Sequence, residues 1–303
     1  MHRVVVVGSA TMDIKARMSE QTSARCAAGR IHNCPGGAAR NIAENLARLS
    51  IQTSLFSALG SDATATEIIT LTALAGVELS NVLQTERGRT ATCLCILDSQ
   101  GEVSHGIHDI GILEMITGDY LDRREDVLSK SNLVVVDSTL PLDSLRRLHE
   151  ICARHKVPLA LMPSSPFPLR VRTLLRDSLM VTPNRREAQL LTGADTATEK
   201  GLKRAAEELL DQGVRMVLIT LGDQGVYYKS KEDEVRLPAF TQKVVDPMGA
   251  SDAFVAGFLY GFLHSLPLLK ALEIGQYTAS LTLDTPFNVH PKLRLDYIHA
   301  SVV

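Results

Sequence analysis

The chain has 303 residues, 45% of them apolar, with 20 glycines and 12 prolines, which suits one large α/β domain with a modest appendage. Lys and Arg number 32 and Asp and Glu number 34, giving a net charge of −2, and no basic run exceeds Arg185-Arg186. A surface for nucleic acid has no support in this composition. We expect no nucleic-acid partner.

The amino-terminal residues also argue against a targeting signal. The apolar run that ends at Val7 is short, and the charged residues Asp13 and Lys15 follow soon after it, so the run predicts a strand. No window approaches the roughly 20 apolar residues of a membrane span. Five cysteines form no C-x-x-C pair, and Cys93 and Cys95 alternate as small apolar fillers along a strand. We expect a soluble protein of the reducing cytoplasm, with no membrane partner.

Short apolar runs alternate with amphipathic segments along the chain, which is typical of β-α-β units around a mostly parallel sheet. The runs that predict buried strands are Arg3–Val7, Thr53–Ala58, Leu133–Val136, Pro158–Met162, Leu179–Val181 and Met216–Thr220. The segments with helical spacing are Ala38–Leu49, Ala65–Ala75, Leu142–His155, Arg186–Leu191, Thr198–Gln212, Ser251–His264 and Leu268–Leu283. The pattern predicts a doubly wound or three-layer α/β/α core.

Two regions, about residues 14–35 and 90–107, interrupt this alternation. The second predicts a strand, a turn at Asp98-Ser99-Gln100-Gly101, and another strand. Together the two regions predict a small β-sheet set apart from the core, within one domain that spans residues 1–303. Such a sheet suits a lid over a substrate pocket or a contact between the two subunits of a homodimer, because its outer face needs cover.

The segment from Asp246 to Asp252, which opens the helix expected from residue 251, carries the clearest chemical pattern. The small residues Gly249, Ala250 and Ser251 let backbone N–H groups converge at a helix N-terminus, where the macrodipole favours negative charge. Asp252 lies in the first turn, within reach of a proton on an attacking hydroxyl. The alternative is an acid that only complements the helix dipole.

A second glycine turn, Gly36-Gly37, feeds the helix that contains Asn41. Glycines without Cβ let a ligand approach the backbone, and an amide can bind vicinal hydroxyls as both donor and acceptor. The alternative is an ordinary tight turn followed by an exposed Asn, which explains the same residues.

Two further segments follow predicted strands. Asn184 and Glu187 share a helical face and could organise Mg²⁺ through water beside phosphates, although an Asn N-cap with an acid at N3 is the structural alternative. The turn from Thr220 through Gly222 to Gly225 ends a buried strand, where α/β sheets bind ligands.

Two common nucleotide-binding motifs are missing from the sequence. A G-x-x-x-x-G-K-[ST] loop is absent, and the first strand is not followed by G-x-G-x-x-G. P-loop NTPases are thereby excluded and dinucleotide enzymes disfavoured.

The order of these segments resembles the PfkB-type, or ribokinase-like, family of sugar and nucleoside kinases. Five ordered matches carry the resemblance: the residues 8–13, the Gly-Gly segment at 36–41, Asn184 with Glu187, Thr220 with Gly222, and the segment 246–252. The resemblance implies a ribokinase-like fold with a β-sheet lid, and transfer of a phosphoryl group from ATP, with Mg²⁺, to a sugar hydroxyl.

The resemblance also implies roles for single residues. The sugar would be held by Asp13, Gly36, Gly37 and Asn41, while Asp252 would be the base beside the amides of residues 249–252. The phosphates and Mg²⁺ would lie near Asn184, Glu187, Thr220, Gly222 and Gly225. Asp246 and the loop around residues 285–291 resemble the region where some members bind a monovalent cation such as K⁺.

Within that family, residues 97–117 and 288–293 are similar to the lid hairpin and a late loop of pseudouridine kinases. This likeness implies a nucleoside acceptor, with Asp109 at the ribose or base edge, although a surface turn also explains that residue. His108 departs from the Asn usual in those enzymes. Ser251 stands where the family usually has the second glycine of Gly-Ala-Gly-Asp. Its Cβ would narrow the anion-binding turn, or strain the backbone if the φ of Ser251 is positive.

The resulting hypothesis is in-line transfer of the γ-phosphoryl group of ATP to a primary hydroxyl, with the 5′-hydroxyl of pseudouridine as the first choice. Ribose, fructose, adenosine and inosine are the alternative acceptors within the family. A nucleoside- or sugar-binding regulator with weak catalysis is the alternative from another class, suggested by Ser251 and the other departures.

Overall fold

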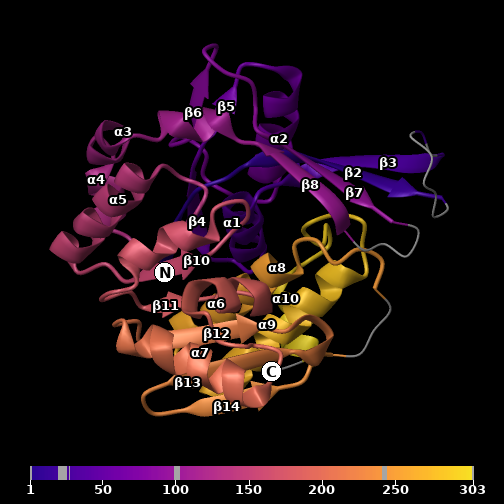
Figure 1. Cartoon of the computed structure of the whole chain (residues 1–303). Coiled ribbons are helices and arrows are strands. Elements are labelled where there is room, and N and C mark those ends of the chain that lie inside the picture. The colour runs from indigo at the N-terminus through magenta and orange to yellow at the C-terminus, as the bar shows by residue number, and fades with distance from the viewer. Residues whose placement is uncertain (1, 20–25, 27, 99–102, 241–243, 302–303) are drawn as a thin grey trace.

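A computed structural model of the chain describes residues 2–19, 26, 28–98, 103–240 and 244–301. Its centre is an eight-stranded sheet with the order β14-β13-β12-β11-β10-β9-β1-β4 (Figure 1). The strands from β12 to β4 pair in parallel, and β13 and β14 extend one edge as antiparallel strands. The strands of this sheet are β1 (Arg3–Val7), β4 (Gln52–Phe56), β9 (Leu133–Asp137), β10 (Leu159–Met162), β11 (Met180–Val181), β12 (Met216–Thr220), β13 (Val226–Ser230) and β14 (Glu234–Leu237).

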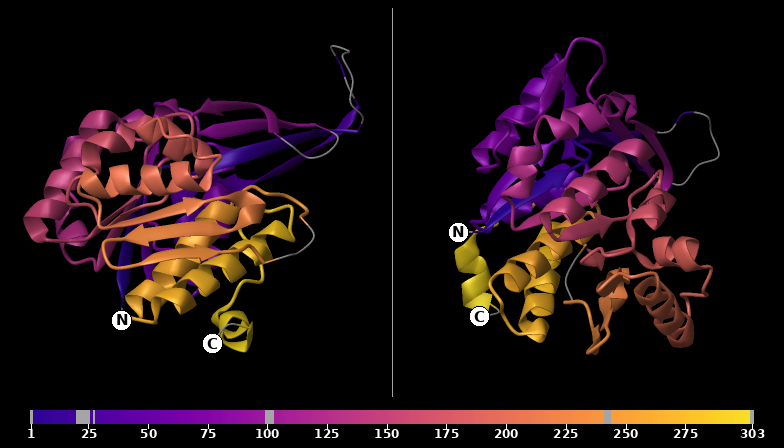
Figure 2. Two further views of the ribbon diagram at one scale, coloured as in Figure 1. Left: turned by 60° about the horizontal axis from the view of Figure 1, so that its bottom comes forward. Right: turned by 90° about the vertical axis from the view of Figure 1, so that its left-hand side faces the viewer.

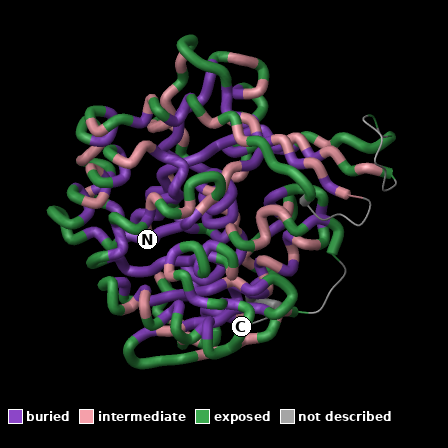
Figure 3. Tube along the Cα trace, in the orientation of Figure 1, coloured by how far each residue is buried: buried purple, intermediate pink, exposed green. Residues whose placement is uncertain are grey.

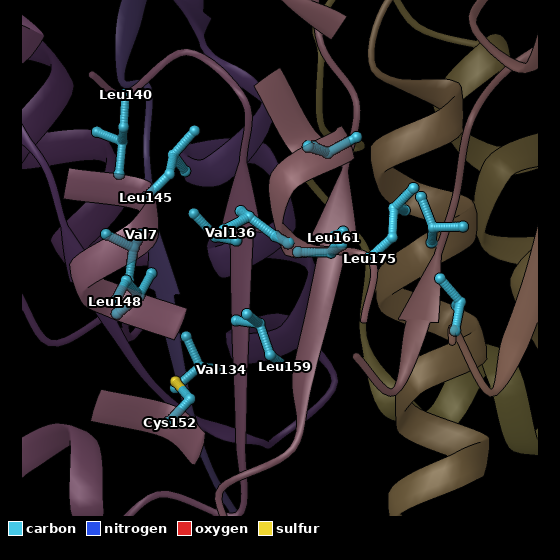
Figure 4. Packing of buried hydrophobic residues seen from close by; sticks show 14 of the residues in the cluster. Val7, Val134, Val136, Leu140, Leu145, Leu148, Cys152, Leu159, Leu161 and Leu175 are labelled. Carbon is cyan, nitrogen blue, oxygen red and sulfur yellow. The ribbon is translucent and has the colours of Figure 1, made fainter. Parts of the chain in front are cut away.

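Helices cover both faces of the sheet, because its central strands are apolar on both sides. Val5 and Val7 of β1 face one buried cluster, while Val4 and Val6 face the other. The first cluster, part of which is drawn in Figure 4, receives α3 (Gly118–Asp122), α4 (Glu125–Ser129), α5 (Leu142–His155), α6 (Arg185–Thr192) and α7 (Glu199–Asp211). The second cluster includes side chains of α1 (Ala38–Arg48), α2 (Ala63–Leu74), α8 (Ala250–Leu263), α9 (Leu268–Leu283) and α10 (Leu295–Ser301). The predicted three-layer α/β/α core is confirmed.

A smaller four-stranded sheet with the order β3-β2-β7-β8 extends away from the core (Figures 1 and 2). It consists of β2 (Thr11–Met18), β3 (Gly29–Gly36), β7 (Thr92–Leu97) and β8 (Val103–Asp109). We call it the lid sheet. The predicted hairpin is present as the antiparallel pair β7 and β8, and the turn residues 99–101 lie outside the described part of the chain.

The lid sheet is more exposed than the core, as Figure 3 shows. Ile31 on β3 is 72% exposed and Ile107 on β8 is 62% exposed. The homodimer contact through this sheet stays a prediction. No described helix is both long and apolar enough to cross a membrane.

Most predicted elements agree with the structure to within two residues at each end. The central strand β1 and the helices α5 and α9 have the predicted bounds. The sequence reasoning missed the edge strands β13 and β14, the short helices α3 and α4, and a two-stranded sheet of β5 (Ala58–Gly60) and β6 (Leu83–Thr85). These elements are short or half exposed, so their hydrophobic period is weak.

The helices α8 and α9 pack very closely, and this contact fixes the helix that begins at the predicted catalytic turn. A Cβ on Gly257 would lie 2.5 Å from Thr278 Oγ1 and 2.8 Å from the carbonyl oxygen of Ile274. A Cβ on Gly275 would likewise lie 2.8 Å from the ring and the carbonyl oxygen of Phe254. Glycine is therefore required at these positions for the two backbones to approach.

Replacing Gly257 with Ala should lower the free energy of unfolding by about 1–3 kcal/mol, because the added methyl group overpacks the helix contact. Urea unfolding measures the change. Gly118→Ala is the matched control, since a Cβ there would meet only the Arg147 side chain, at 3.6 Å. Equal stability of the two variants would contradict the packing argument.

Candidate active site

A cavity of about 440 Å³ opens at the carboxyl ends of the parallel strands, where sheets of this type place their sites. Its floor is formed by residues that end or follow β1, β9, β10, β11 and β12, and its wall by residues of the lid sheet. The start of α8 closes one side. The predicted site residues that line it are Asp13, Gly37, Asn41, Asn184, Glu187, Thr220, Gly249, Ser251 and Asp252.

Asp252 lies in the first turn of α8 with its carboxylate on the cavity. The Asn41 side-chain amide donates to Asp252 Oδ2 at 2.8 Å, so the carboxylate is oriented by an amide and not by an ion pair. Burial raises its pKa to about 7, and the nearby charges of Asp137, Asp13 and Glu187 act in the same direction against the Asn41 hydrogen bond. A carboxylate with such a pKa suits proton transfer near neutral pH.

The turn before Asp252 is built around Gly249 at the start of α8. Gly249 is the N-cap of α8 in the left-handed conformation, with φ of 84°, and no side chain caps this helix end. A Cβ on Gly249 would lie 2.0 Å from the carbonyl oxygen of Asn288, so only glycine fits. Ala250 does not line the cavity. Ser251 is helical with its φ outside the positive region, so its substitution for glycine brings no backbone strain.

Asp13 and Asn41 face the cavity from β2 and α1, as the sequence predicted. Asp13 Oδ1 accepts a hydrogen bond from Thr11 Oγ1 at 2.6 Å, and Asp13 Oδ2 accepts one from Asn288 Nδ2 at 2.6 Å. Burial raises the pKa of Asp13. Gly36 does not line the cavity but lies beneath this carboxylate, since a Cβ there would be 2.2 Å from Asp13 Oδ2.

Asn184 and Glu187 form a capping box at the start of α6, so the structural alternative for this pair is present. The Asn184 N–H donates to Glu187 Oε2 at 2.8 Å, and the Glu187 N–H donates to Asn184 Oδ1 at 2.9 Å. Both residues also line the cavity. Burial raises the pKa of Glu187 to about 7 against the hydrogen bonds from Asn184. The capping role therefore coexists with a position on the cavity wall.

The glycines after Thr220 do not line the cavity, although Thr220 does. Gly225 has φ of 86° in the turn before β13, and a Cβ there would lie 2.1 Å from the carbonyl oxygen of Leu237. Gly222 has φ of 61° with open space where a Cβ would be. Gly225 thus serves the turn into the edge hairpin, and Gly222 is exposed.

Asp109 is exposed and does not line the cavity, whereas its neighbours His108 and Ile110 do. The alternation of side chains along β8 explains this: His108 faces inward and contacts Cys93, with Nε2 at 3.8 Å from Sγ. Burial lowers the pKa of His108, so the imidazole is neutral near pH 7. His108 therefore lines the cavity from β8, and Asp109 does not.

Asp246 is paired with a cation that belongs to the chain itself. Lys15 Nζ lies 2.7 Å from Asp246 Oδ2, and both side chains are buried. The same ammonium donates to the carbonyl oxygen of Pro286 at 3.0 Å. The carboxylate that was predicted as a ligand of a monovalent cation therefore already binds the Lys15 ammonium.

Three site features were missed by sequence reasoning. Asn288 and Thr182 line the cavity, and their buried Oδ1 and Oγ1 atoms have no hydrogen-bond partner among the described residues. A ligand or a water molecule can satisfy these atoms, since an unpaired buried polar group is costly. Asp137, at the end of β9, accepts hydrogen bonds from the N–H and hydroxyl of Ser9 at 2.8 and 2.6 Å and from the Ala39 N–H at 3.3 Å. It ties the β1 loop to the start of α1.

Comparisons with known proteins identify the family of this chain. The family model of pfkB carbohydrate kinases matches residues 1–286. The chain is 29% identical to the pseudouridine kinase of Escherichia coli, covering 96% of this chain and 94% of that protein. It is 30% identical to a ribokinase of Schizosaccharomyces pombe, covering 93% and 92%.

A solved structure of Arabidopsis thaliana ribokinase complexed with ribose and ATP superposes with a TM-score of 0.87 at 23% identity, covering 99% of this chain and 98% of that one. This likeness shows the ribokinase fold. The chain belongs to the pfkB family of carbohydrate kinases, and it is a phosphotransferase of the sugar and nucleoside kinase type.

The raised pKa of Asp252 predicts that Asp252→Asn stabilises the protein, by about 1–4 kcal/mol at pH 8. A carboxyl group with a raised folded-state pKa contributes stability below its unfolded pKa and loses it as pH rises through about 7. The gain from Asn should therefore grow between pH 5 and pH 8. Urea unfolding at both values measures it, and a gain independent of pH would contradict the assignment.

Proposed function

We propose that this protein transfers the γ-phosphoryl group of ATP to the 5′-hydroxyl of a nucleoside, with pseudouridine as the preferred acceptor. The observation that carries the proposal is the position of Asp252, on the cavity, in the first turn of an uncapped helix N-terminus, and oriented by Asn41. A base and an anion cradle lie within one helical turn of each other. This arrangement is what in-line phosphoryl transfer requires.

In the reaction, Asp252 accepts the proton of the acceptor hydroxyl as its oxygen bonds to the γ-phosphorus. The bond from that phosphorus to the bridging oxygen of ADP breaks, and ADP leaves. The backbone N–H groups at the start of α8 stabilise the charge on the transferring group. The lid sheet contributes Cys93 and His108 to the wall, and Ile110 directly follows β8, so together they limit the access of water to the phosphate.

The charge on the cavity wall fits a nucleotide that arrives with a divalent cation. Asp13, Glu187 and Asp252 line the cavity, and no Lys or Arg among the described residues does. A polyphosphate beside three carboxylates needs positive charge, which Mg²⁺ supplies when bound. Glu187 would hold the ion through water beside Asn184, in keeping with the oxygen donors that Mg²⁺ prefers. Thr220 and Gly222 would lie near the nucleotide.

The acceptor end of the cavity supports a ribosyl substrate. Asp13 and Asn288 offer adjoining polar atoms, and the free Asn288 Oδ1 can accept a hydrogen bond from a hydroxyl. Gly37 lines the cavity, and glycine is required there because its φ is 90° and a Cβ would lie 2.5 Å from the carbonyl oxygen of Ser9. The neutral imidazole of His108 can pair with a nucleobase edge. The similarity to a pseudouridine kinase supports a nucleoside as one candidate acceptor.

A panel of acceptors tests the proposal. The protein is incubated with ATP, Mg²⁺ and, separately, pseudouridine, uridine, adenosine, inosine, ribose and fructose, and ADP release and the phosphorylated product are measured. We expect kcat/KM for pseudouridine to exceed that for each other acceptor by at least about tenfold, a difference of roughly 1.4 kcal/mol in transition-state binding.

A higher kcat/KM for ribose or fructose would contradict the nucleoside assignment while leaving the kinase class intact. Saturable binding of nucleosides without any ADP release would contradict the kinase proposal and favour a nucleoside-binding regulator. His108→Ala gives a further control, since it should lower kcat/KM for nucleosides more than for ribose.

A further inference from the structure

Lys15 is a buried ammonium on the lid strand β2, away from the cavity lining. The residue is 3% exposed, and its Nζ atom contacts Asp246 Oδ2 at 2.7 Å and the carbonyl oxygen of Pro286 at 3.0 Å. Asp13 lies two residues earlier on the same face of the strand and binds Asn288. Burying a charge is costly unless it is paired, so this contact fixes where the strand meets the core.

The two partners of Lys15 belong to the two segments that contact the turn at residues 249–252, which we call the anion turn. Asp246 uses its other oxygen, Oδ1, to accept from the Met248 N–H at 2.8 Å, which shapes the chain just before Gly249. Pro286 lies two residues before Asn288, whose carbonyl oxygen packs directly against Gly249. A displacement of either segment would therefore move the N–H groups at the start of α8.

We propose that Lys15 is a positioning residue, a cation tethered to the lid sheet that holds the anion turn in its catalytic geometry. Its ammonium occupies a site between a carboxylate oxygen and a carbonyl oxygen, the type of ligand that hard cations take. The protein therefore needs no added monovalent cation. The inference rests on the proposed kinase function, because its main readout is turnover.

The first measurement is made on the unmodified protein. Turnover is compared in buffers that contain only tetramethylammonium, which is too large for the site, and in K⁺, ammonium or Na⁺ at one ionic strength. We expect kcat to agree within about twofold among them, because the tethered ammonium is always present. A dependence of wild-type kcat on K⁺ of tenfold or more would overturn the proposal.

The second measurement removes the tether. In tetramethylammonium, Lys15→Ala should lower kcat by roughly 10- to 100-fold, because a small displacement of the turn misaligns the transferring group. Added K⁺, ammonium or methylammonium should restore at least part of the loss, and the larger tetramethylammonium should not. Lys130→Ala is the matched control, since that lysine forms an exposed pair with Asp126 and should keep wild-type kcat.

A readout without activity separates this inference from the kinase proposal. Binding of a cation to the folded Lys15→Ala protein should raise its thermal midpoint in K⁺ relative to tetramethylammonium at equal ionic strength, with no such change in wild type. If no acceptor is phosphorylated by wild type, the kinase proposal fails, while this thermal comparison still tests the tether. Wild-type kcat in the Lys15→Ala variant, or rescue that does not depend on cation size, would overturn the inference.

Discussion

Three carboxylates face one cavity in this protein, and that accumulation of negative charge governs how the site can work. Asp13, Glu187 and Asp252 line the cavity, while none of the described Lys or Arg residues does. Burial raises the pKa of each, to about 7 for Glu187 and Asp252. In the proposed reaction, positive charge beside the phosphoryl group would come from the amino end of α8 and from a cation bound with the nucleotide. The fold therefore keeps that helix end uncapped and directed at the cavity.

The lid sheet and the anion turn form one mechanical unit. Strand β2 supplies Asp13, which binds Asn288, and Lys15, which binds Asp246 and Pro286, so two inward side chains of one strand hold the loop beside Gly249. On the other side, α8 is fixed by its close glycine contacts with α9. The Asp13 carboxylate and the turn at Gly249 are thus positioned by the same contacts, which in the proposed reaction would align the two ends of the site.

Local sequence patterns predicted the strands, helices and glycine turns of this protein. Buried strands such as Met216–Thr220 and amphipathic helices such as Leu142–His155 follow from hydrophobic period, and glycine turns before helices marked Gly37 and Gly249. The contacts between residues far apart in the sequence could not be predicted from such local patterns. Lys15 with Asp246 and Asp13 with Asn288 join positions 231 and 275 residues apart, and no local pattern encodes such a pair. Asp109 was predicted at the ribose or base edge, but it is exposed and does not line the cavity, whereas its neighbour His108 does, as strand alternation explains.

The central claim is that the Asp252 carboxylate is the base, and turnover of Asp252→Asn as a function of pH tests it most directly. In wild type, kcat/KM should fall about tenfold for each pH unit below about 7, because protonation removes the base. Asp252→Asn should lower kcat by roughly 10²–10⁴, leave ATP affinity nearly unchanged and lose this dependence. A variant that turns over within about threefold of wild type, or that keeps the same pH profile, would contradict the account.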